Sequence, residues 1–537
     1  MMNPLEILKS SRWFDRCWYR TTYPDVAQAR MDEEEHYLRV GEPQGWKPCP
    51  DFDGKWYLRQ YPDVARAGIS PLVHFILHGE HEGRMPGPLE SPALEEELWR
   101  GAADDQTLER LTELTRSDRR REAEHSSFAL ARWYASDGDW QQVLRSFRPA
   151  RSRRLFDPPN HAACVLEIEA LSRCGRFDEA VERLNELRQK APDFNDAHLL
   201  ASNRLYLLAV ARAEVDTAVN LETDCERLEH INRCWEPTEM EQLVLNSAGS
   251  PLTLENLTVD GVTTSFEEER AAGPDRPLVT VIVPAFNCAG TLATALDSLV
   301  AQSLFRAGSG LVEVIVVDDA SDDDTAAVAG AYAATHAAIR LIRRTLNEGS
   351  YAARNCGLAA SLGRFITTHD ADDWSYPKKL EMQVRLLLEH PDVMACTSHW
   401  ARCDDRLVFG HWRIEEGWIY RNVSSLMFRR EVFETLGFWD RVRVEADTEY
   451  FYRIRAAFGP DSLGEAMPGV PLSFGRVRAE SLSRKRETHL ATQFRGVRAE
   501  YRSASERWYS SARSRTDLFM PRHPTQRLFP APESILP

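Results

Sequence analysis

Short apolar runs alternate with amphipathic stretches between residues 278 and 368. Runs of Val, Ile and Leu predict buried strands, and apolar residues three or four positions apart predict helices. The predicted strands cover residues 278–283, 312–317, 339–343 and 365–368, and the predicted helices cover 291–302, 325–335 and 351–361. This alternation indicates a doubly wound, mostly parallel α/β sheet, which binds ligands beyond the carboxyl ends of its strands.

The hydrophobic pattern of residues 1–92 is a tandem repeat. Trp18 and His36 recur 38 residues later as Trp56 and His74, and the stretch Tyr-Pro-Asp-Val-Ala occurs in both copies. Aromatic residues at fixed offsets predict small, mainly helical units that bury their apolar faces against each other. We interpret the histidines and the turn aspartates as structural, with ligand binding as the alternative.

Residues 93–250 show helical periodicity. Gly138 and Trp140 are matched by Gly175 and Phe177, so a helix pair with a glycine turn is predicted twice. The second pair resembles a tetratricopeptide unit. Such helices serve either as a protein-docking surface or as a spacer packed on the next domain, and the pattern favours neither.

Length and composition indicate several globular domains. The chain has 537 residues, of which 43% are hydrophobic and 28% are charged, and this length predicts about two to four domains. Residues 251–277 are predicted to form a linker, because residues 267–277 read Glu-Glu-Glu-Arg-Ala-Ala-Gly-Pro-Asp-Arg-Pro, although residues 253–262 could hold a strand. The net charge of −16 argues against a nucleic-acid partner.

The hydropathy pattern predicts neither a membrane span nor a secretion signal. No run of about 18 apolar residues is present, and the first residues lack the apolar core of a signal peptide. The ten cysteines are scattered without a Cys-x-x-Cys pair, so we expect reduced thiols in a cytoplasmic protein.

Residues 486–537 are predicted to form a basic amphipathic helix and a tail. One apolar stripe recurs at helical spacing, at Leu490, Phe494, Val497, Tyr501, Ala504 and Trp508. Arginines flank this stripe, and two interpretations stay open. The helix docks on the anionic inner face of the plasma membrane, or it packs against the α/β domain and its arginines meet acidic groups there.

Acidic residues gather where the fourth predicted strand ends. Asp370, Asp372 and Asp373 follow the apolar run 365–368, and Asp447 lies further along the chain. Carboxylates crowded at a strand end repel one another unless a cation is present, so the cluster suits a divalent metal that holds a diphosphate. A separate carboxylate such as Asp447 can act as a base.

Polar residues also follow the earlier strands. The first strand leads into Pro284, Phe286 and Asn287, and the second ends at Asp318 and Asp319. Aspartates at this edge can accept hydrogen bonds from a base and a ribose. Each motif is weak alone, but their order on successive strand ends makes the set specific.

Arg354 follows the third strand, in a helix that a glycine-bearing loop opens. An arginine near a helix N-terminus is well placed to bind a diphosphate. The strand ends therefore predict a nucleotide site with both anionic and cationic groups.

In this order the motifs resemble a family 2 glycosyltransferase of the GT-A fold. The matching stretches are Val-Ile-Val-Pro-Ala-Phe-Asn at 281–287, Val-Asp-Asp-Ala-Ser-Asp-Asp-Asp-Thr at 317–325, Asn-Glu-Gly at 347–349, Ala-Arg-Asn-Cys-Gly at 353–357, Thr-His-Asp-Ala-Asp-Asp-Trp at 368–374, Gly-Phe-Trp-Asp at 437–440 and Ala-Asp-Thr-Glu at 446–449. The resemblance implies a GT-A catalytic domain over residues 278–485. The N-terminal repeat resembles a unit that accompanies bacterial polysaccharide-related glycosyltransferases.

The resemblance implies a role for each matching residue near the nucleotide. Pro284 and Asp319, with Asp318 beside them, would line the base pocket. Phe286 and Asn287 would belong to the same nucleotide-sugar site.

Further roles follow for the phosphate and acceptor side of the site. Arg354 would support the nucleotide, and Asp370 and Asp372 would form the Asp-x-Asp motif. Asp372 or Asp373 would bind Mn²⁺ or Mg²⁺, and Asp447 would be the catalytic base.

Three features depart from the family pattern. Ala446 stands where the family often has Glu, although the base itself is retained. Ala320 replaces the usual Gly of the turn after the second strand and is expected to fit there with a negative φ. Residues 474–483 lack the His that often assists the metal, and His489 is the nearest, so the third protein ligand stays open.

We expect an inverting, metal-dependent glycosyltransferase that uses a nucleotide-sugar, with a UDP-sugar the commonest donor in the family. Its acceptor would be a glycan or lipid-linked glycan in bacterial surface polysaccharide synthesis, such as capsule, O-antigen or exopolysaccharide. The alternative is a catalytically inactive, glycosyltransferase-like scaffold that binds protein partners through its helical repeats. A nucleotidyltransferase would share the sheet and the acidic cluster but would lack the Asp447 motif.

Overall fold

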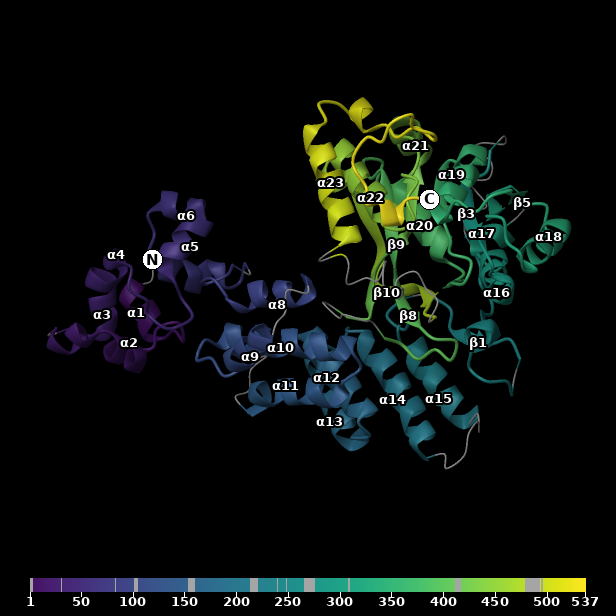
Figure 1. Cartoon of the computed structure of the whole chain (residues 1–537). Helices are drawn as coiled ribbons and strands as arrows, with labels where there is room; N and C mark the ends of the chain where they lie inside the picture. The colour runs from purple at the N-terminus through teal and green to yellow at the C-terminus, as the bar shows by residue number, and fades with distance from the viewer. Residues whose placement is uncertain are drawn as a thin grey trace. The chain divides into compact units, whose positions relative to one another are not determined.

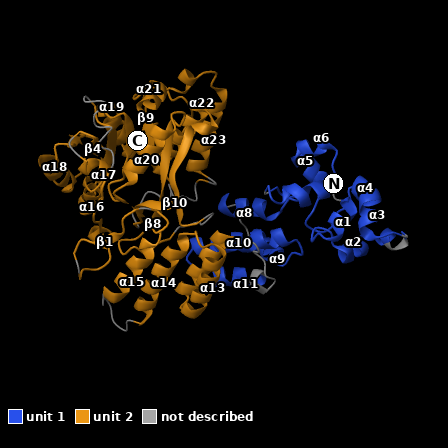
Figure 2. Cartoon of the chain, turned by 180° about the vertical axis from the view of Figure 1, so that it is seen from behind, with its two compact units in different colours: residues 1–158 blue, residues 159–537 orange. Residues whose placement is uncertain are grey.

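The computed structural model describes residues 3–29, 31–82, 84–100, 105–152, 160–212, 221–238, 240–247, 249–264, 276–307, 310–410, 417–478, 493 and 496–537. The chain divides into two compact units, Met1–Pro158 and Pro159–Pro537, which Figure 2 colours separately. Each unit has hydrophobic core of its own.

Unit 1 begins with two copies of a small helical motif (Figure 1). After α1 (Pro4–Lys9), the first copy contains α2 (Arg16–Thr22), η1 (Pro24–Gln28), α3 (Glu33–His36), η2 (Tyr37–Gly41) and α4 (Glu42–Gln44), and the second contains α5 (Gly54–Gln60), α6 (Pro62–Ala67), α7 (Pro71–His74) and η3 (Phe75–Gly79). The hydroxyl of Tyr19 lies 3.1 Å from Nδ1 of His36, and the hydroxyl of Tyr57 lies 3.1 Å from Nδ1 of His74. The same contact in both copies supports a structural role for the histidines. The family resemblance of the repeat stays a prediction.

Longer helices follow in both units. They are α8 (Ser91–Arg100), α9 (Asp105–Leu114), α10 (Arg120–Ser136) and α11 (Trp140–Ser152) in unit 1, and α12 (His161–Arg173), α13 (Phe177–Lys190), α14 (Asp196–Arg212) and α15 (Leu221–Asn232) in unit 2. Gly138 between α10 and α11 has φ 76°, and Gly175 between α12 and α13 has φ 75°. Both turns therefore use the left-handed conformation that favours glycine. The tetratricopeptide likeness stays a prediction.

Unit 2 contains an eight-stranded mixed sheet in the order β5-β4-β3-β6-β9-β8-β10-β7. Its strands are β3 (Val279–Ala285), β4 (Val312–Asp318), β5 (Ile339–Arg343), β6 (Phe365–Thr368), β7 (Trp374–Ser375), β8 (Ala395–Cys403), β9 (Ile419–Arg429) and β10 (Leu463–Arg476). The first four pair in parallel, as the sequence predicts. In the other half β8 and β10 are parallel, whereas β9 pairs antiparallel with β6 and β8, and β7 with β10. The expectation of a mostly parallel sheet thus holds for the first half only.

Helices cover both faces of this sheet (Figure 1). One core contains residues of α16 (Ala289–Val300), α17 (Ser303–Arg306), α18 (Thr325–Thr335) and α20 (Lys379–Glu389), and the other contains residues of α19 (Ser350–Ala360), α21 (Arg430–Leu436) and α22 (Ala446–Phe458). Val281 and Val283 belong to the first core and Ile282 to the second, as in a strand buried on both faces. The predicted multidomain class, a helical N-terminal half followed by an α/β domain, is confirmed.

Helices α14 and α15 pack on the α/β domain within unit 2. Nδ2 of Asn203 donates to the carbonyl of Phe409 at 2.7 Å, and its Oδ1 accepts from the Phe409 N–H at 2.8 Å. Trp235, just after α15, stacks on Tyr376 with 5.4 Å between ring centroids. The chain then forms β1 (Leu243–Leu245), η4 (Leu254–Asn256) and β2 (Leu257–Val259). This part of the helical region is thus packed on the α/β domain, as the spacer interpretation expects.

The C-terminal segment forms α23 (Val497–Ser511), η8 (Arg515–Leu518) and η9 (Glu533–Ile535), and η6 (Pro460–Ser462) follows α22. Tyr501 and Ala504 are buried in the core that α22 shares. Leu490 and Phe494 of the predicted stripe lie outside the described residues. The described part of the stripe therefore faces the α/β domain, as the packing interpretation expects.

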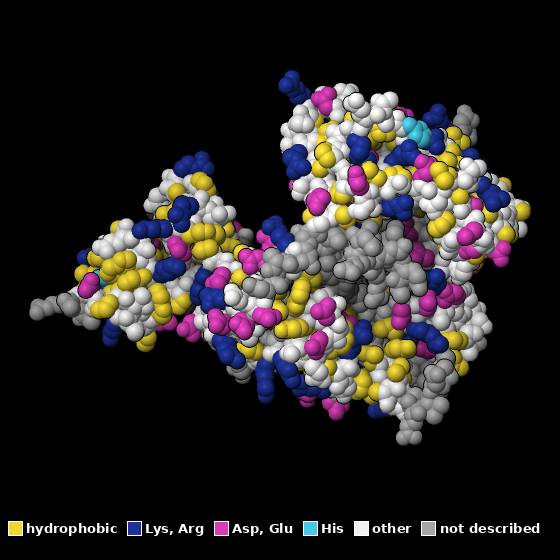
Figure 3. All heavy atoms as spheres, in the orientation of Figure 1, with side chains coloured by type: hydrophobic (Ala, Val, Ile, Leu, Met, Phe, Trp, Pro, Cys, Tyr) yellow, Lys and Arg dark blue, Asp and Glu magenta, His cyan; other side chains and the backbone are white. Residues whose placement is uncertain are grey.

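Two observations concern the surface. On the face shown in Figure 3, basic and acidic side chains are interspersed over the coloured residues. Over the described part of the chain, no helix is both long enough and apolar enough to cross a bilayer.

Candidate active site

Arg354 of α19 joins two groups of predicted acidic residues. Its Nη2 donates to Oδ1 of Asp370 at 2.7 Å, and its Nη1 lies 3.9 Å from Oδ2 of Asp447. The Arg354 side chain is 5% exposed, whereas those of Asp370 and Asp447 are 31% and 23% exposed. A buried cation therefore holds together two carboxylates that still reach solvent.

The surroundings of Arg354 keep it charged. Burial by itself lowers the pKa of Arg354, but the negative charge of Asp370, the nearby Tyr351 and the charge of Asp447 outweigh burial and raise it. The guanidinium also lies 5.0 Å from the ring centroid of Tyr351, within range of a cation–π contact. The cation is thus a fixed feature of the site at physiological pH.

Asp372 and Asp373 lie in the turn after β6, beside Asp370. Burial, followed by the charge of Asp370, raises the pKa of Asp372 to about 6. Burial, followed by the charges of Asp372 and Asp370, raises the pKa of Asp373 well above its usual value. Two ionised carboxylates are costly here unless a cation balances them. The turn therefore fits a divalent metal, whose charge would favour the ionised form of both.

The protein would supply only a few of the ligands that such a metal needs. Oδ1 of Asp373 accepts a hydrogen bond from the backbone N–H of Arg476 at 3.0 Å, and Nε of Arg476 donates to the carbonyl of Asp372 at 3.0 Å. Among the described residues, no group of three His, Cys, Asp or Glu is arranged to hold a metal, and His489 lies outside them. One or two carboxylates with substrate phosphates completing the shell is a usual arrangement for Mg²⁺.

The two aspartates at the end of β4 have different partners. Oδ2 of Asp319 accepts from the backbone N–H of Gly349 at 2.8 Å, and Asp319 also pairs with Arg344. Oδ1 of Asp318 accepts a hydrogen bond from the backbone N–H of Ser321, in the following turn, at 3.0 Å. Oδ2 of Asp318 is buried and accepts no hydrogen bond, with Nε of Arg343 3.5 Å away. That oxygen can accept a hydrogen bond from a ligand.

The end of β3 exposes an aromatic ring. Phe286 is 48% exposed, and an exposed ring at this edge can stack on a planar ligand. Asn287 has φ 46°, and its Oδ1 accepts from the backbone N–H of Asp322 at 3.1 Å, which connects the ends of β3 and β4. Pro284 is half-buried within β3. These residues thus share one edge of the sheet with the aspartates of β4.

Ala320 departs from the expectation for its backbone. Its φ is 64°, in the left-handed region, rather than negative. This conformation costs a residue with a Cβ about 1–2 kcal/mol. The hydrogen bonds of the neighbouring Asp318 and Asp319 hold the turn in place despite that cost.

Residues 280–442 match the family described as Glycosyl transferase family 2. This part of the chain is a glycosyltransferase domain that is similar to that family. The match includes Pro284 to Asp373 and Arg354, and it ends before Asp447. The base assignment for Asp447 therefore rests on its contact with Arg354 and on the motif around it.

Relatives of the glycosyltransferase domain match it over short stretches. Succinoglycan biosynthesis protein ExoO of Rhizobium meliloti (strain 1021) is 39% identical over 117 residues, which are 22% of this chain and 30% of that protein. The uncharacterized glycosyltransferase YibD of Escherichia coli (strain K12) is 31% identical over 123 residues, 23% of this chain and 34% of that protein. The chain spans about a third of the length of these relatives.

Two solved structures are also similar to part of the chain. The crystal structure of S. aureus TarS 1-349 is 17% identical, covers 37% of this chain and 60% of that chain, and has a TM-score of 0.31. Mannosyltransferase PcManGT from Pyrobaculum calidifontis, in complex with GDP-Man and Mn²⁺, is 27% identical, covers 36% and 58%, and has a TM-score of 0.27.

A buried polar chain behind the acidic turn of the glycosyltransferase domain was not predicted. Oγ of Ser375 lies 2.9 Å from Nε2 of His369 and accepts from Nζ of Lys379 at 3.2 Å. Burial lowers the pKa of His369 to about 3 and that of Lys379 to about 8. Both ring nitrogens of His369 have protein partners, the second being the carbonyl of Asp370 at 2.8 Å. His369 directly precedes the Asp-x-Asp motif, and this position could have indicated its role from the sequence. Lys379 stands at a position that the sequence pattern would place on the surface.

Two arginines of the domain were also missed. Arg344 pairs with Asp319, and its place directly after the third strand was a usable signal. Arg476 is buried and pairs with Asp405 and, at 2.6 Å, with Glu255. Those partners lie 71 and 221 positions away in the chain, so no local pattern indicates the contact.

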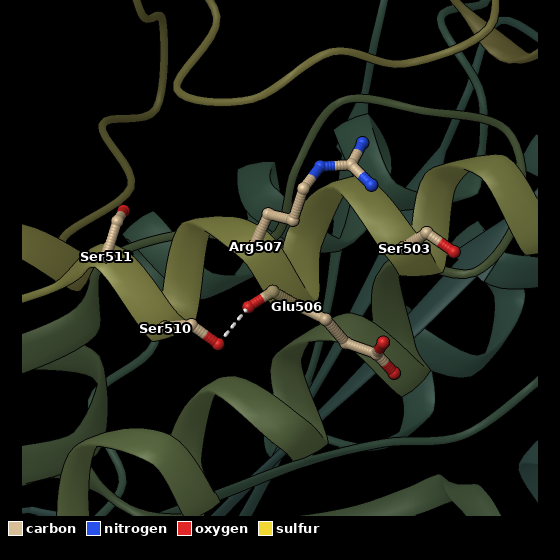
Figure 4. A pocket seen from close by; sticks show the side chains of 5 residues that line it. All are labelled: Ser503, Glu506, Arg507, Ser510 and Ser511. Atoms are coloured by element: carbon tan, nitrogen blue, oxygen red, sulfur yellow. Dashed lines mark hydrogen bonds between the residues drawn. The ribbon is translucent and has the colours of Figure 1, made fainter.

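Two surface cavities are lined by residues of α22, η6 and α23. Figure 4 shows one of about 530 Å³ on α23, lined by Ser503, Glu506, Arg507, Ser510 and Ser511. A second, of about 380 Å³, lies between α22 and α23 and shares Glu506. None of the predicted site residues, all of which are described, lines either cavity.

Proposed function

We propose that the glycosyltransferase domain transfers a sugar from a nucleotide-sugar to an acceptor hydroxyl with inversion. The observation that carries the proposal is the position of Arg354, which donates to Asp370 at 2.7 Å and lies 3.9 Å from Asp447. The buried guanidinium thus connects Asp370, in the proposed nucleotide-sugar site, to Asp447, the proposed base. The departing diphosphate and the attacking hydroxyl would therefore meet beside it.

The strand ends are proposed to bind the nucleotide part of the donor. Asp318 and Asp319 would accept hydrogen bonds from the base and ribose, and Oδ2 of Asp318, which pairs with Arg343 but accepts no hydrogen bond, supports that role. The exposed ring of Phe286 would stack on the base. Pro284 and Asn287 would shape the same pocket.

The acidic turn is proposed to hold the diphosphate through a metal. Asp372 and Asp373 would bind Mn²⁺ or Mg²⁺, and their raised pKa values support a need for a cation there. The bound ion supplies positive charge that stabilises the leaving diphosphate. Arg354 would add hydrogen-bond donors to the same developing charge.

Asp447 is proposed to take the proton of the acceptor hydroxyl. Its side chain is partly exposed, so a hydroxyl can reach it, and the first turn of α22 holds it. The hydroxyl oxygen forms a bond to the anomeric carbon as the carbon–oxygen bond to the diphosphate breaks, and Asp447 ends protonated. Attack from the face opposite the leaving group inverts the anomeric configuration.

The proposed substrates are a UDP-sugar and a glycan or lipid-linked glycan of a bacterial surface polysaccharide. The commonest donor of the resembled family and the name of the relative ExoO support this choice. We place the reaction in the cytoplasm, at the inner face of the plasma membrane. The helical repeats preceding the domain are proposed to recruit a protein partner.

A donor panel tests the proposal. The full chain is incubated with UDP-, GDP- and dTDP-sugars and Mn²⁺, with and without glycan acceptors, and nucleoside diphosphate release is measured. Release from one donor, increased by an acceptor, is expected. No release and no nucleotide binding by calorimetry would contradict the enzyme and favour the inactive scaffold. Formation of pyrophosphate from a nucleoside triphosphate and a sugar phosphate would instead indicate a nucleotidyltransferase.

A further inference from the structure

Glu445 precedes the proposed base Asp447 by two residues and is held by the C-terminal helix. Its φ is 74°, and its carboxylate is buried. Nη1 of Arg498 lies 2.5 Å from Oε1 of Glu445, and Nη2 of Arg502 lies 3.3 Å from Oε2. A left-handed residue that is not glycine persists only where its surroundings fix it. The two arginines of α23 supply that fixation.

Two more carboxylates near Asp447 in the sequence are bound by side chains of the C-terminal segment. Asp440 accepts from the hydroxyl of Tyr501 at 3.0 Å and pairs with Arg527. Glu449, in the first turn of α22, accepts from the hydroxyl of Tyr509 at 3.0 Å. Both carboxylates are buried. The contacts therefore continue on both sides of the proposed base.

Apolar contacts fix α23 against the domain as well. Tyr501 lies in the core shared with α22 and contacts the ring of Phe529, with 5.3 Å between centroids. Trp508 stacks on the same ring at 5.1 Å. The arginines of α23 thus project from a helix that is itself held in place.

We propose that Arg498 and Arg502 are positioning residues for sugar transfer. Through Glu445 they fix the first turn of α22 and hence the carboxylate of Asp447. The inference rests on the proposed function. It also makes α23 necessary for catalysis, although this helix lies beyond residues 280–442, which match the family.

The physical reason is the cost of leaving Glu445 buried without a partner. Without the arginines its carboxylate would move toward water, and its left-handed backbone would relax. A shift of about 1 Å in a catalytic group can cost about 10²-fold in rate. The proposed nucleotide contacts lie on α19 and at the carboxyl ends of β3, β4 and β6, which do not contact Glu445 through the arginines of α23, so we expect them to keep their places.

The experiment separates positioning from simple stability. Arg498→Met in the full chain is expected to lower kcat by about 10- to 100-fold, while calorimetry shows unchanged affinity for the nucleoside diphosphate of the donor that the panel identifies. Arg498→Lys is expected to recover part of the loss, because an ammonium can still pair with Glu445. Arg507→Met, an exposed arginine of the same helix, is the matched control and is expected to behave as the wild type.

Two further variants keep the test decisive. Arg502→Met removes the longer and more exposed contact and is the substitute if Arg498→Met does not fold. Glu445→Gln combined with Arg498→Met is expected to lose less kcat than the product of the two single losses, because both changes act on the Glu445–Arg498 contact.

Wild-type kcat in both folded arginine variants would overturn the inference and leave the proposed function intact. A loss of kcat that disappears at temperatures far below each variant's unfolding transition would also overturn it. A wild-type chain that transfers no sugar would overturn the proposed function itself.

Discussion

Arg354 in α19 donates a 2.7 Å hydrogen bond to Asp370 at the end of β6. The other terminal nitrogen of the same guanidinium lies 3.9 Å from Asp447. Two carboxylates that are distant in the sequence therefore meet at one buried cation. The proposed donor and acceptor halves of the site share this single group.

Replacing Arg354 is expected to impair transfer severely. Arg354→Met should lower kcat/KM by about 10²–10³-fold, the usual cost of losing one donor aimed at developing charge. Arg354→Lys keeps the charge but cannot contact both carboxylates as a planar guanidinium does, so its activity should lie between those of the wild type and Arg354→Met. Steady-state transfer kinetics measure both. Arg364→Met, an exposed arginine beside β6, is the control, and normal transfer by Arg354→Met would refute the assignment.

Asp447→Asn is expected to remove the base without disturbing the nucleotide site. The amide cannot accept the acceptor proton, so kcat should fall by about 10²–10⁴-fold. Nucleotide affinity, measured by calorimetry, should stay unchanged because asparagine has the same shape as aspartate and Arg354 keeps its hydrogen bond to Asp370. Asp461→Asn, an exposed aspartate just beyond α22, is the matched control. Persistent transfer by Asp447→Asn would show that another group takes the proton.

Removal of divalent ions is expected to stop transfer, and Mn²⁺ or Mg²⁺ to restore it. The reason is the pair formed by the half-buried Asp372 and the buried Asp373, whose raised pKa values indicate that a cation is needed to ionise both. Asp372→Asn should raise the Mn²⁺ concentration needed for half-maximal activity, because one negative ligand is lost. Titration of chelated enzyme with Mn²⁺ measures this. Full activity in excess chelator would exclude the metal role.

The elements of the parallel half-sheet could be predicted closely from the sequence. Residues 339–343, 365–368 and 325–335 have the same bounds in β5, β6 and α18. Apolar runs and helical spacing are local signals, so each element can be recognised without its neighbours. The antiparallel pairing of β9 was not predictable in this way, because it depends on a long-range register.

The site was only partly predictable for the same reason. Asp370 and Asp447 stand in motifs that recur in a family, and their types are informative by themselves. Arg476 and Glu445 stand in no such motif, and their roles arise from partners elsewhere in the chain. Lys379 is buried on a helix whose pattern reads as amphipathic, so burial there required the tertiary structure.

Ala320→Gly is expected to stabilise the protein. Ala320 has φ 64°, and glycine adopts this region without the Cβ clash, so the free energy of unfolding should rise by about 0.5–1 kcal/mol. Ala327→Gly, in the exposed part of α18, should lower it by about 0.5–1 kcal/mol. Denaturant unfolding of both variants gives the comparison, and destabilisation by Ala320→Gly would show that the turn tolerates alanine.

Asp196 is expected to make stability depend on pH. It lies buried at the start of α14 and accepts from the backbone N–H groups of Trp418 and, at 3.3 Å, Ile419. Burial raises the pKa of Asp196 to about 7, although these hydrogen bonds oppose the shift. An unfolded chain has an aspartate pKa of about 3.9. The folded state therefore binds the proton more tightly.

The sign of the effect follows from that difference. The contribution of Asp196 to stability is fully present below about pH 4 and is lost as the pH rises to about 7. Asp196→Asn keeps an acceptor oxygen but cannot ionise, so it should become more stable than the wild type by about 2–4 kcal/mol near neutral pH. Urea unfolding between pH 4 and 8 should show this difference growing with pH. Asp193→Asn, an exposed position three residues earlier, is the control and should show no pH-dependent difference from the wild type. A difference for Asp196→Asn that stays constant between pH 4 and 8 would mean that Asp196 is ionised in the folded protein over that whole range.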